Sequence, residues 1–408
     1  MRSTYVAHYS EVALKGKNRP EFVRALRRNL RRSLWGLEPE VQLRDGRFVV
    51  TAEGSADLMS SRIGRTFGIA WFSPATIVRP EYESIQEAVL QEAHASSGGT
   101  FKVDPRRSDK TFPLTSHELA SRLGAAVAAD TGMKVNLSSP DLALHVDVTR
   151  NHAMIYSRRQ SGPGGLPLGT AGRVMHLFSG GIDSPVAAWL MMKRGCVPVY
   201  LHFYLAPTPS AAIESKVTQL VRTLSSFGGK STLVLAPFAE YQLATAGVPG
   251  DLEPSLFRRF MRMTAEALAS GFGASAISTG DSLSQAASQT LWNMAAHDEG
   301  SSVPIMRPLL TYDKEEIVAL ARKIGTYDLS LQEYKDCCAI VTRHPRTRVK
   351  PALVTEYVRR FQLDGLVWKT LEASTLVTYN PAGDLLKSVP LSVTVPEIAA
   401  TARPKADL

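Results

Sequence analysis

Residues 173–195 contain an apolar segment, a glycine pair and a second apolar segment, an order typical of a strand, a tight turn and a helix. Gly180 and Gly181 allow the backbone to bend so that successive N–H groups face one point. The start of the following helix adds its partial positive charge at the same point. Ser184 can cap this helix and Gly195 can end it. The sequence therefore predicts a site for an anion such as a phosphate group.

The type of phosphate site follows from what surrounds the glycine pair. The common motif G-x-x-x-x-G-K-[ST] needs a lysine after its second glycine, and here Asp183 occupies the turn instead. A second glycine pair at 228–229 lacks the first glycine of that motif, and we interpret it as a helix end that enters a strand. The string at 179–184, Ser-Gly-Gly-Ile-Asp-Ser, resembles the PP-loop of ATP pyrophosphatases, which cleave ATP between its α and β phosphates and adenylate a substrate. An ordinary strand-turn-helix corner is the weaker alternative, because six positions match together.

Composition and charge set the wider limits. A chain of 408 residues with 44% apolar and 21% charged residues is typical of a globular protein of two to four domains. The net charge of +9 suits a polyanionic partner such as nucleic acid, although the charge alone does not require one. No apolar run is long enough to span a bilayer, and the first residues lack the apolar stretch of a secretion signal, so we expect a cytoplasmic protein without membrane contact.

The chain has three cysteines, too few for a disulfide framework or a four-cysteine metal site. Cys337 and Cys338 are adjacent in a basic segment that includes Lys335 and Arg343, and positive charge favours the reactive thiolate. We therefore predict a nucleophile or sulfur carrier here, with buried inert thiols as the alternative. Cys196 stands at the start of a predicted strand and is expected in the core.

The composition of the chain changes along its length, and the changes predict four segments. Residues 1–58 form a first domain with a helix near 20–34, whose arginines fall mostly outside the apolar stripe and face solvent. The first 50 residues hold 11 Lys and Arg against 5 Asp and Glu, an excess that can track a phosphate backbone or merely solvate a helix face. Residues 59–166 mix helices and strands and end in a glycine- and proline-rich linker.

From residue 167 to about 370 strands and helices alternate, which predicts a doubly wound parallel sheet with helices on both faces. The last segment, 371–408, contains four prolines and is expected to be a loose tail. The predicted fold class is thus α/β, preceded by two smaller α+β domains.

In a doubly wound sheet a ligand lies beyond the carboxyl ends of the strands. The first such end, Leu177-Phe178, enters the glycine turn, and the second, His202-Phe203, offers backbone amides and an aromatic surface to an adenine ring. A partner-bonded core histidine is the alternative for His202.

A third strand end leads into the segment 278–290. Gly280 permits a close backbone approach, Asp281 could bind Mg²⁺ or cap a helix, and Gln289 can donate to a nucleotide. Arg259, on a helix that is mostly core, could reach a phosphate.

These motifs, in this order, resemble the tRNA 4-thiouridine synthetases, also called tRNA sulfurtransferases. The resemblance covers residues 11–19, 101–112, 164–167, the PP-loop, 280–290 and Asp336-Cys337-Cys338, and so extends over about residues 5–350. It implies a ferredoxin-like domain at 1–58, a THUMP domain at 59–166 and a PP-loop domain at 167–370. It also implies that Cys338 takes part in sulfur transfer and that Asp183 lies near the phosphates. The PP-loop residues implied to bind ATP are Ser179, Gly180, Gly181 and Ser184. The other residues implied to line ATP are Leu177, Phe178, His202, Phe203, Arg259, Gly280 and Gln289.

The implied reaction replaces O4 of uridine 8 of a tRNA by sulfur. AMP is first attached to O4 with release of pyrophosphate, and a persulfide sulfur then attacks C4; Mg²⁺ and fixed donors offset the phosphate charge. Cys338 would carry the sulfur or close a disulfide that frees it, while the amino-terminal domains would bind the tRNA.

Some family members append a rhodanese domain that bears the persulfide, whereas only 70 residues and no cysteine follow Cys338 here. We therefore expect the sulfur to come from a cysteine desulfurase, a separate carrier or free sulfide, and to reach Cys337 or Cys338. A contribution to thiamine thiazole synthesis and a homodimeric state stay open. Two other functions also stay open: a different PP-loop adenylase such as a 2-thiolating tRNA enzyme, and a noncatalytic RNA-binding protein.

Overall fold

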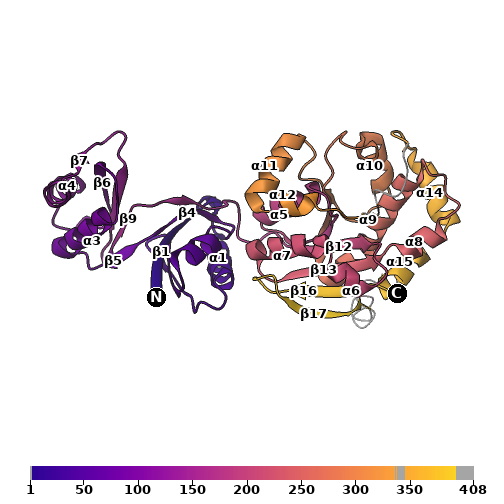
Figure 1. The fold of residues 1–408 in the computed structure, drawn as a ribbon, viewed down its shortest axis with the longest axis horizontal. Coiled ribbons are helices and arrows are strands. Elements are labelled where there is room, and N and C mark those ends of the chain that lie inside the picture. The colour runs from indigo at the N-terminus through magenta and orange to yellow at the C-terminus, as the bar shows by residue number, and fades with distance from the viewer. Residues whose placement is uncertain (1, 336, 338–344, 392–408) are drawn as a thin grey trace. The chain divides into compact units, whose positions relative to one another are not determined.

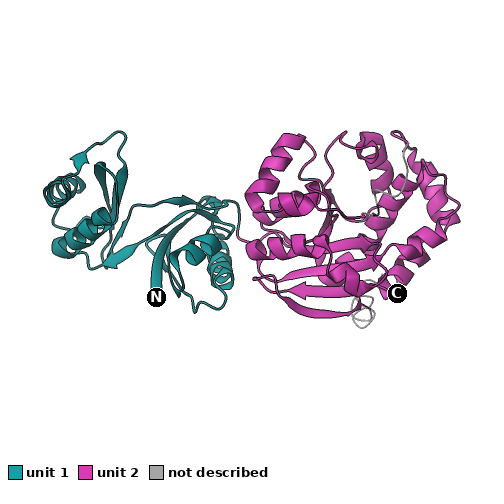
Figure 2. Cartoon of the chain, viewed as in Figure 1, with its two compact units in different colours: residues 1–166 teal, residues 167–408 magenta. Residues whose placement is uncertain are grey.

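The computed structural model describes residues 2–335, 337 and 345–391. The chain divides into two compact units, residues 1–166 and 167–408 (Figure 2). Within the described ranges no helix is both long and apolar enough to cross a membrane.

The first unit contains two separate five-stranded sheets, each with its own helices (Figure 1). The first sheet has the order β10-β4-β1-β3-β2, and its strands pair antiparallel. Its elements are β1 (Arg2–Tyr9), η1 (Glu11–Leu14), α1 (Arg19–Ser33), β2 (Glu40–Arg44), β3 (Arg47–Glu53), α2 (Ala56–Ile63), β4 (Ile69–Pro74) and β10 (Gln160–Ser161). The apolar stripe expected near 20–34 lies on α1, where Leu26 and Leu30 are buried against this sheet.

The second sheet of this unit has the order β5-β9-β8-β6-β7. Two helices pack together beside it and share its apolar core, and α4 begins with a capping box between Thr115 and Glu118. Its elements are β5 (Thr76–Val78), α3 (Tyr82–His94), β6 (Thr100–Arg107), α4 (Ser116–Thr131), β7 (Lys134–Val135), β8 (Leu142–Val148) and β9 (Ala153–Tyr156).

The boundary predicted at residues 58/59 does not coincide with the division between these sheets. Residue 58 lies inside α2, and β4 pairs with β1 in the first sheet. Strand β10, far along the chain, also returns to the first sheet by pairing with β4. The first sheet therefore includes residues beyond 58, because strand pairing, and not local composition, decides which strand belongs to it.

The second unit is built on one seven-stranded sheet of order β15-β14-β11-β12-β13-β16-β17. The pairings from β15 to β13 are parallel, which confirms the doubly wound sheet. These strands are β11 (Arg173–Leu177), β12 (Val197–Tyr204), β13 (Ser231–Pro237), β14 (Ala274–Ser278) and β15 (Ile305–Met306).

The expected tail at 371–408 is partly wrong. β16 (Thr375–Tyr379) pairs antiparallel with β13, and β17 (Leu385–Pro390) pairs antiparallel with β16, so this hairpin closes one edge of the sheet. Leu391 is buried beside it, and residues 392–408 lie outside the described ranges.

Helices cover both faces of this sheet. The hydroxyl of Tyr200 on β12 donates to the sulfur of Met192 on α5, whereas the next residue, Leu201, lies in the core shared with α9. Neighbouring strand residues point to opposite faces, so α5 and α9 lie on opposite sides. The helices are α5 (Asp183–Lys193), α6 (Pro209–Ile213), α7 (Lys216–Gly228), α8 (Ala239–Ala244), α9 (Glu253–Phe272), η2 (Ala287–Gln289), α10 (Leu291–Asp298), α11 (Lys314–Ile324), α12 (Tyr327–Leu331), α14 (Pro351–Arg360) and α15 (Leu363–Glu372).

Candidate functional site

A cavity of about 370 Å³ lies where the carboxyl ends of β11, β12 and β14 meet. Most of the side chains expected at the site line it together, although they are spread over more than 150 residues of the chain. They are Leu177, Phe178, Ser179, Gly181, Asp183, Ser184, His202, Phe203, Gly280, Asp281, Gln289 and Cys337. The wall is completed by residues that the sequence did not indicate, among them Arg258, Phe257, Met261 and Thr279.

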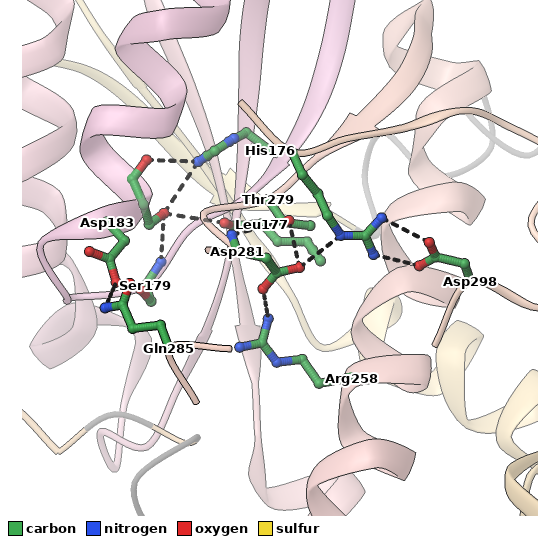
Figure 3. A network of polar contacts seen from close by, with 11 residues as sticks. His176, Leu177, Ser179, Asp183, Arg258, Thr279, Asp281, Gln285 and Asp298 are labelled. Atoms are coloured by element: carbon green, nitrogen blue, oxygen red, sulfur yellow. Dashed lines mark hydrogen bonds and ion pairs between the residues drawn. The ribbon is translucent and has the colours of Figure 1, made fainter. Parts of the chain in front are cut away.

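The PP-loop is held by hydrogen bonds around Ser184, and Figure 3 labels its partners Leu177 and Ser179. Its hydroxyl donates to the carbonyl of Leu177 and accepts from the backbone N–H of Ser179, both at 3.2 Å. The prediction that Ser184 caps α5 is wrong, because the cap position is Ile182 and no side chain of the described residues caps this helix. The first residues of α5, Asp183 and Ser184, line the cavity. The uncapped start of this helix therefore faces the space where an anion would bind.

His176 connects three elements behind the loop. Its Nδ1 lies 3.0 Å from the hydroxyl of Ser278 on β14, and its Nε2 lies 3.0 Å from the carbonyl of Ser184 on α5. Because a carbonyl only accepts, Nε2 carries the proton and Nδ1 accepts from the serine. Complete burial lowers the pKa of His176 to about 4, so the ring is neutral at pH 7.

Two glycines allow neighbouring segments to approach the loop closely. A Cβ at Gly280 would lie 2.9 Å from the backbone N and Cα of Ser184, and a Cβ at Gly180 would lie 2.8 Å from Cε of Lys216. The backbone of Ser184 cannot yield to an added Cβ, whereas the flexible end of Lys216 can move aside. The loop after β14 therefore lies directly against the start of α5.

Asp183 is the carboxylate at the open side of the loop. Nζ of Lys314, at the start of α11, lies 2.6 Å from one carboxylate oxygen, and Nε2 of Gln285 donates to the other at 3.1 Å. Lys314 lies 131 residues from Asp183, and nothing in the local sequence pairs the two.

Asp281 is buried within a chain of charges (Figure 3). One carboxylate oxygen accepts from Arg258 at 2.8 Å, and the other accepts from Thr279 at 2.8 Å and from Arg307 at 3.2 Å. Burial alone would raise its pKa, but Arg258, the threonine hydroxyl and Arg307 outweigh burial and lower it, so the carboxylate is ionised. Asp281 is buried and each of its oxygens accepts from an arginine, so it does not fit a direct Mg²⁺ ligand.

Arg259 does not reach the cavity, and this expectation is wrong. Its guanidinium donates to the carbonyl of Ala296 and to Glu299, and the side chain is buried among α9 and α10. The preceding residue, Arg258, lines the cavity instead.

Part of the cavity wall is apolar. Leu177, Phe178 and Phe203 form its walls, and Oε1 of Gln289 is buried with no hydrogen-bond partner among the described residues. A buried amide oxygen without a partner is costly, and a ligand amino group would satisfy it. His202 is bonded on both sides, to the carbonyl of Phe178 at 2.8 Å and to the hydroxyl of Tyr334 at 2.7 Å, so it shapes this wall.

The two expected reactive cysteines differ in what the structure describes. Cys337 is 1% exposed, lines the cavity, and its thiol donates to the carbonyl of Phe203 at 3.1 Å. Cys338, Arg343 and His344 lie outside the described residues. Cys196 is buried as expected, and desolvation raises the pKa of its thiol.

No cluster of three or more His, Cys, Asp or Glu that could hold a metal ion occurs in the described part of the chain. Mg²⁺ in nucleotide sites is commonly held by one or two carboxylates together with phosphates. Asp183, partly exposed at the helix start, is a carboxylate suited to that arrangement.

Three models of known protein families match the chain. The ThiI ferredoxin-like domain matches residues 4–73, the THUMP domain residues 82–158, and the model described as thiamine biosynthesis protein (ThiI) residues 169–363. Together they cover most of the chain.

Two curated relatives and one solved structure match the chain over nearly its full length, and a second solved structure shows the same fold. The chain is 40% identical to a probable tRNA sulfurtransferase of Moorella thermoacetica over 95% of this chain and 100% of the relative, and 38% identical to one of Thermus thermophilus over 94% and 95%. A crystal structure of a 4-thiouridine synthetase–RNA complex with bound ATP superposes with a TM-score of 0.85 at 33% identity, over 93% of this chain and 100% of that one. PH1313 of Pyrococcus horikoshii shares the fold, with a TM-score of 0.62 at 23% identity over 79% and 99% of the two chains.

Proposed function

The chain belongs to the tRNA sulfurtransferase family, and we propose that it uses ATP to convert uridine 8 of tRNA to 4-thiouridine. The observation that carries this proposal is the cavity at the PP-loop, which combines, among the described residues, a helix start without a side-chain cap, an apolar wall and a buried Gln289 amide oxygen without a partner. These features suit the phosphates and the base of one nucleotide. The similar solved structure contains both RNA and ATP.

The reaction needs ATP because O4 of uracil is a poor leaving group. The oxygen attacks the α phosphate, the bond to the β phosphate breaks, and pyrophosphate leaves. A persulfide sulfur then attacks C4, and AMP departs with the original oxygen. A second thiol attacks the inner sulfur of the carrier, so that the S–S bond to the transferred sulfur breaks and a disulfide forms, which an external thiol then reduces. The product carries sulfur where the substrate carried O4.

The chain's own residues have separate tasks in this proposal. The adenosine would lie against Leu177, Phe178 and Phe203, and Gln289 would accept from the adenine amino group. The phosphates would lie over 179–184. Mg²⁺ would be held by Asp183 and the phosphates, and would offset the negative charge that grows during transfer.

Two cations supply further positive charge to the phosphates. Arg258 lines the cavity and is oriented by Asp281, and Lys314 reaches the loop at Asp183. Guanidinium and ammonium groups that are fixed before the reaction stabilise developing charge without reorganisation.

Sulfur delivery would depend on the segment that contains the cysteines. Cys337 is buried and bonded to a carbonyl, so we assign sulfur transfer to Cys338, supplied by a cysteine desulfurase or another sulfur donor. The first unit, with its basic α1, would bind the tRNA, and a tRNA substrate would place the enzyme in the cytoplasm.

The test is mass spectrometry of unmodified tRNA incubated with the enzyme, Mg-ATP, a cysteine desulfurase and cysteine. We expect 4-thiouridine at position 8, with AMP and pyrophosphate as products. Asp183→Asn keeps the shape of the side chain but removes its charge, and should lower the rate at least 100-fold with tRNA binding intact. Release of ADP, or thiolation at another atom, would refute the proposal.

A further inference from the structure

An exposed aromatic side chain follows the cavity residue Gln289 closely in the chain and has no task in the reaction described above. Trp292, in the first turn of α10, keeps 53% of its surface exposed. It is three residues beyond Gln289, which lines the cavity. The guanidinium of Arg348 lies over its ring, 4.6 Å from the ring centroid.

Hydrogen bonds of the buried Asn293 side chain hold Trp292 and Arg348 in place. The side chain of Asn293 is fully buried, and its amide donates to the carbonyls of Ala287 at 2.7 Å and Arg346 at 2.8 Å. Its carbonyl oxygen accepts from the backbone N–H of Val349 at 2.9 Å. The backbone on either side of Trp292 is therefore tied to the backbone on either side of Arg348.

A further hydrogen bond connects the same two segments: the hydroxyl of Thr290 donates to the carbonyl of Thr347 at 2.7 Å. An exposed tryptophan gains little stability from its apolar surface in water. Here the fold nevertheless fixes the indole and its cation in position. This is the arrangement of a binding surface that is formed before its partner arrives.

The charge around the pair indicates the chemical class of the partner. Residues 345–355 contain Arg346, Arg348 and Lys350 and no acidic residue. Arg346 pairs with Asp251, while Arg348 and Lys350 are exposed. An exposed aromatic ring with cations near it suits single-stranded nucleic acid, in which a base stacks on the ring while phosphates meet the cations.

We propose that Trp292 and Arg348 form a stacking site for an unpaired base of the substrate RNA, next to the cavity where the target uridine reacts. This inference rests on the proposed function for the identity of the RNA. The base would lie on the open surface of the indole, and Lys350 would meet an adjacent phosphate. Stacking there would hold the strand so that a neighbouring uridine enters the cavity.

The test is the affinity of the full-length protein for unmodified tRNA, measured by fluorescence anisotropy without ATP. Trp292→Ala should weaken binding by about 5-fold to 100-fold, the effect expected for one stacked base. Trp292→Phe, which keeps a ring, should restore most of the affinity. Lys350→Ala should weaken binding and reduce the slope of log affinity against log salt by roughly 0.7 to 0.9.

The matched control is Trp368→Ala, which removes a tryptophan of the same unit that is 39% exposed on α15 and should leave tRNA affinity unchanged. ATP affinity should be unchanged in Trp292→Ala, which checks that the cavity is intact. Equal tRNA affinity of wild type and Trp292→Ala would overturn the inference. The inference would also be overturned if Trp292→Ala lost turnover with a cysteine desulfurase but kept turnover with free sulfide. That result would show that the surface binds the sulfur-donor protein and not RNA.

The binding comparison does not depend on the product of the reaction. If wild type binds tRNA but makes no 4-thiouridine, the proposed function fails, and the affinities of the variants still decide whether Trp292 contacts RNA.

Discussion

Two adjacent arginines show how much a single residue position matters on a helix. Arg258 lines the cavity and bonds Asp281, whereas Arg259 is buried against Ala296 and Glu299. Successive residues on a helix differ in direction by about 100°, so only one of the two can face the ligand. The sequence analysis chose Arg259 as the cation from this helix, and the structure places Arg258 at the cavity instead, because the choice depends on how α9 packs on the sheet.

Asp281 gives a prediction at the scale of one residue. Asp281→Asn would leave Arg258 and Arg307 close together without the charge that compensates them. Removing one partner of a buried ion pair costs about 3–5 kcal/mol of unfolding free energy. The pKa of Asp281 is lowered by its partners, so its stabilisation is complete above the unfolded-state pKa and is lost as pH falls through the folded-state pKa.

The measurement is urea unfolding at pH 7 of wild type and Asp281→Asn. Glu372→Gln, which neutralises an exposed carboxylate at the end of α15, serves as the control and should change stability by less than about 0.5 kcal/mol. If both variants unfold like wild type, Asp281 has no structural role. The hypothesis that Asp281 binds Mg²⁺ would then have to be considered again.

At the scale of elements, the close approach between the loop after β14 and the start of α5 gives the next prediction. Gly280→Ala would place a Cβ 2.9 Å from the backbone of Ser184 and push the two segments apart. We expect ATP affinity to fall at least 10-fold, measured by isothermal titration calorimetry. Gly365→Ala is the control: it lies inside α15 with no atom near the added Cβ, and should stabilise the helix by about 0.5–1 kcal/mol without changing ATP affinity. Unchanged affinity in Gly280→Ala would show that the approach is not needed.

The sequence predicted the helices and strands better than it predicted which strands pair with one another. Alternation of strand and helix was enough to predict the parallel strands and the cavity at their carboxyl ends. It was not enough for β16 and β17, where Pro381 and Pro390 argued against a strand. Pro390 ends β17 at the edge of the sheet, a position that tolerates the missing N–H. The boundary at residue 58 failed for a related reason, since local patterns do not reveal which strands will pair.

At the scale of the whole molecule, buried histidines couple stability to pH in both units. Desolvation is the largest cause that lowers the pKa of each, to about 4 for His176 and about 3 for His297 in the second unit. The same direction holds in the first unit for the buried His145 and His152 and for the half-buried His8. Each ring resists protonation in the folded protein and accepts a proton near pH 6.5 once unfolded, so acid favours the unfolded chain.

We therefore predict that the free energy of unfolding falls as pH decreases from 7.5 to 5. His176 and His297 should each contribute a loss on the order of 2 kcal/mol, because their unfolded forms bind protons over this range while their folded forms do not. Urea unfolding at constant salt measures the loss. Ring resonances of these two histidines, followed by NMR in the native protein, should not titrate above pH 5. The prediction is contradicted if the free energy of unfolding stays constant or rises towards pH 5, or if these rings titrate near pH 6.5 in the native protein. Either result would mean that water reaches both rings. It would also mean that the hydrogen bonds of His176 hold β11, β14 and α5 together less firmly than their distances indicate.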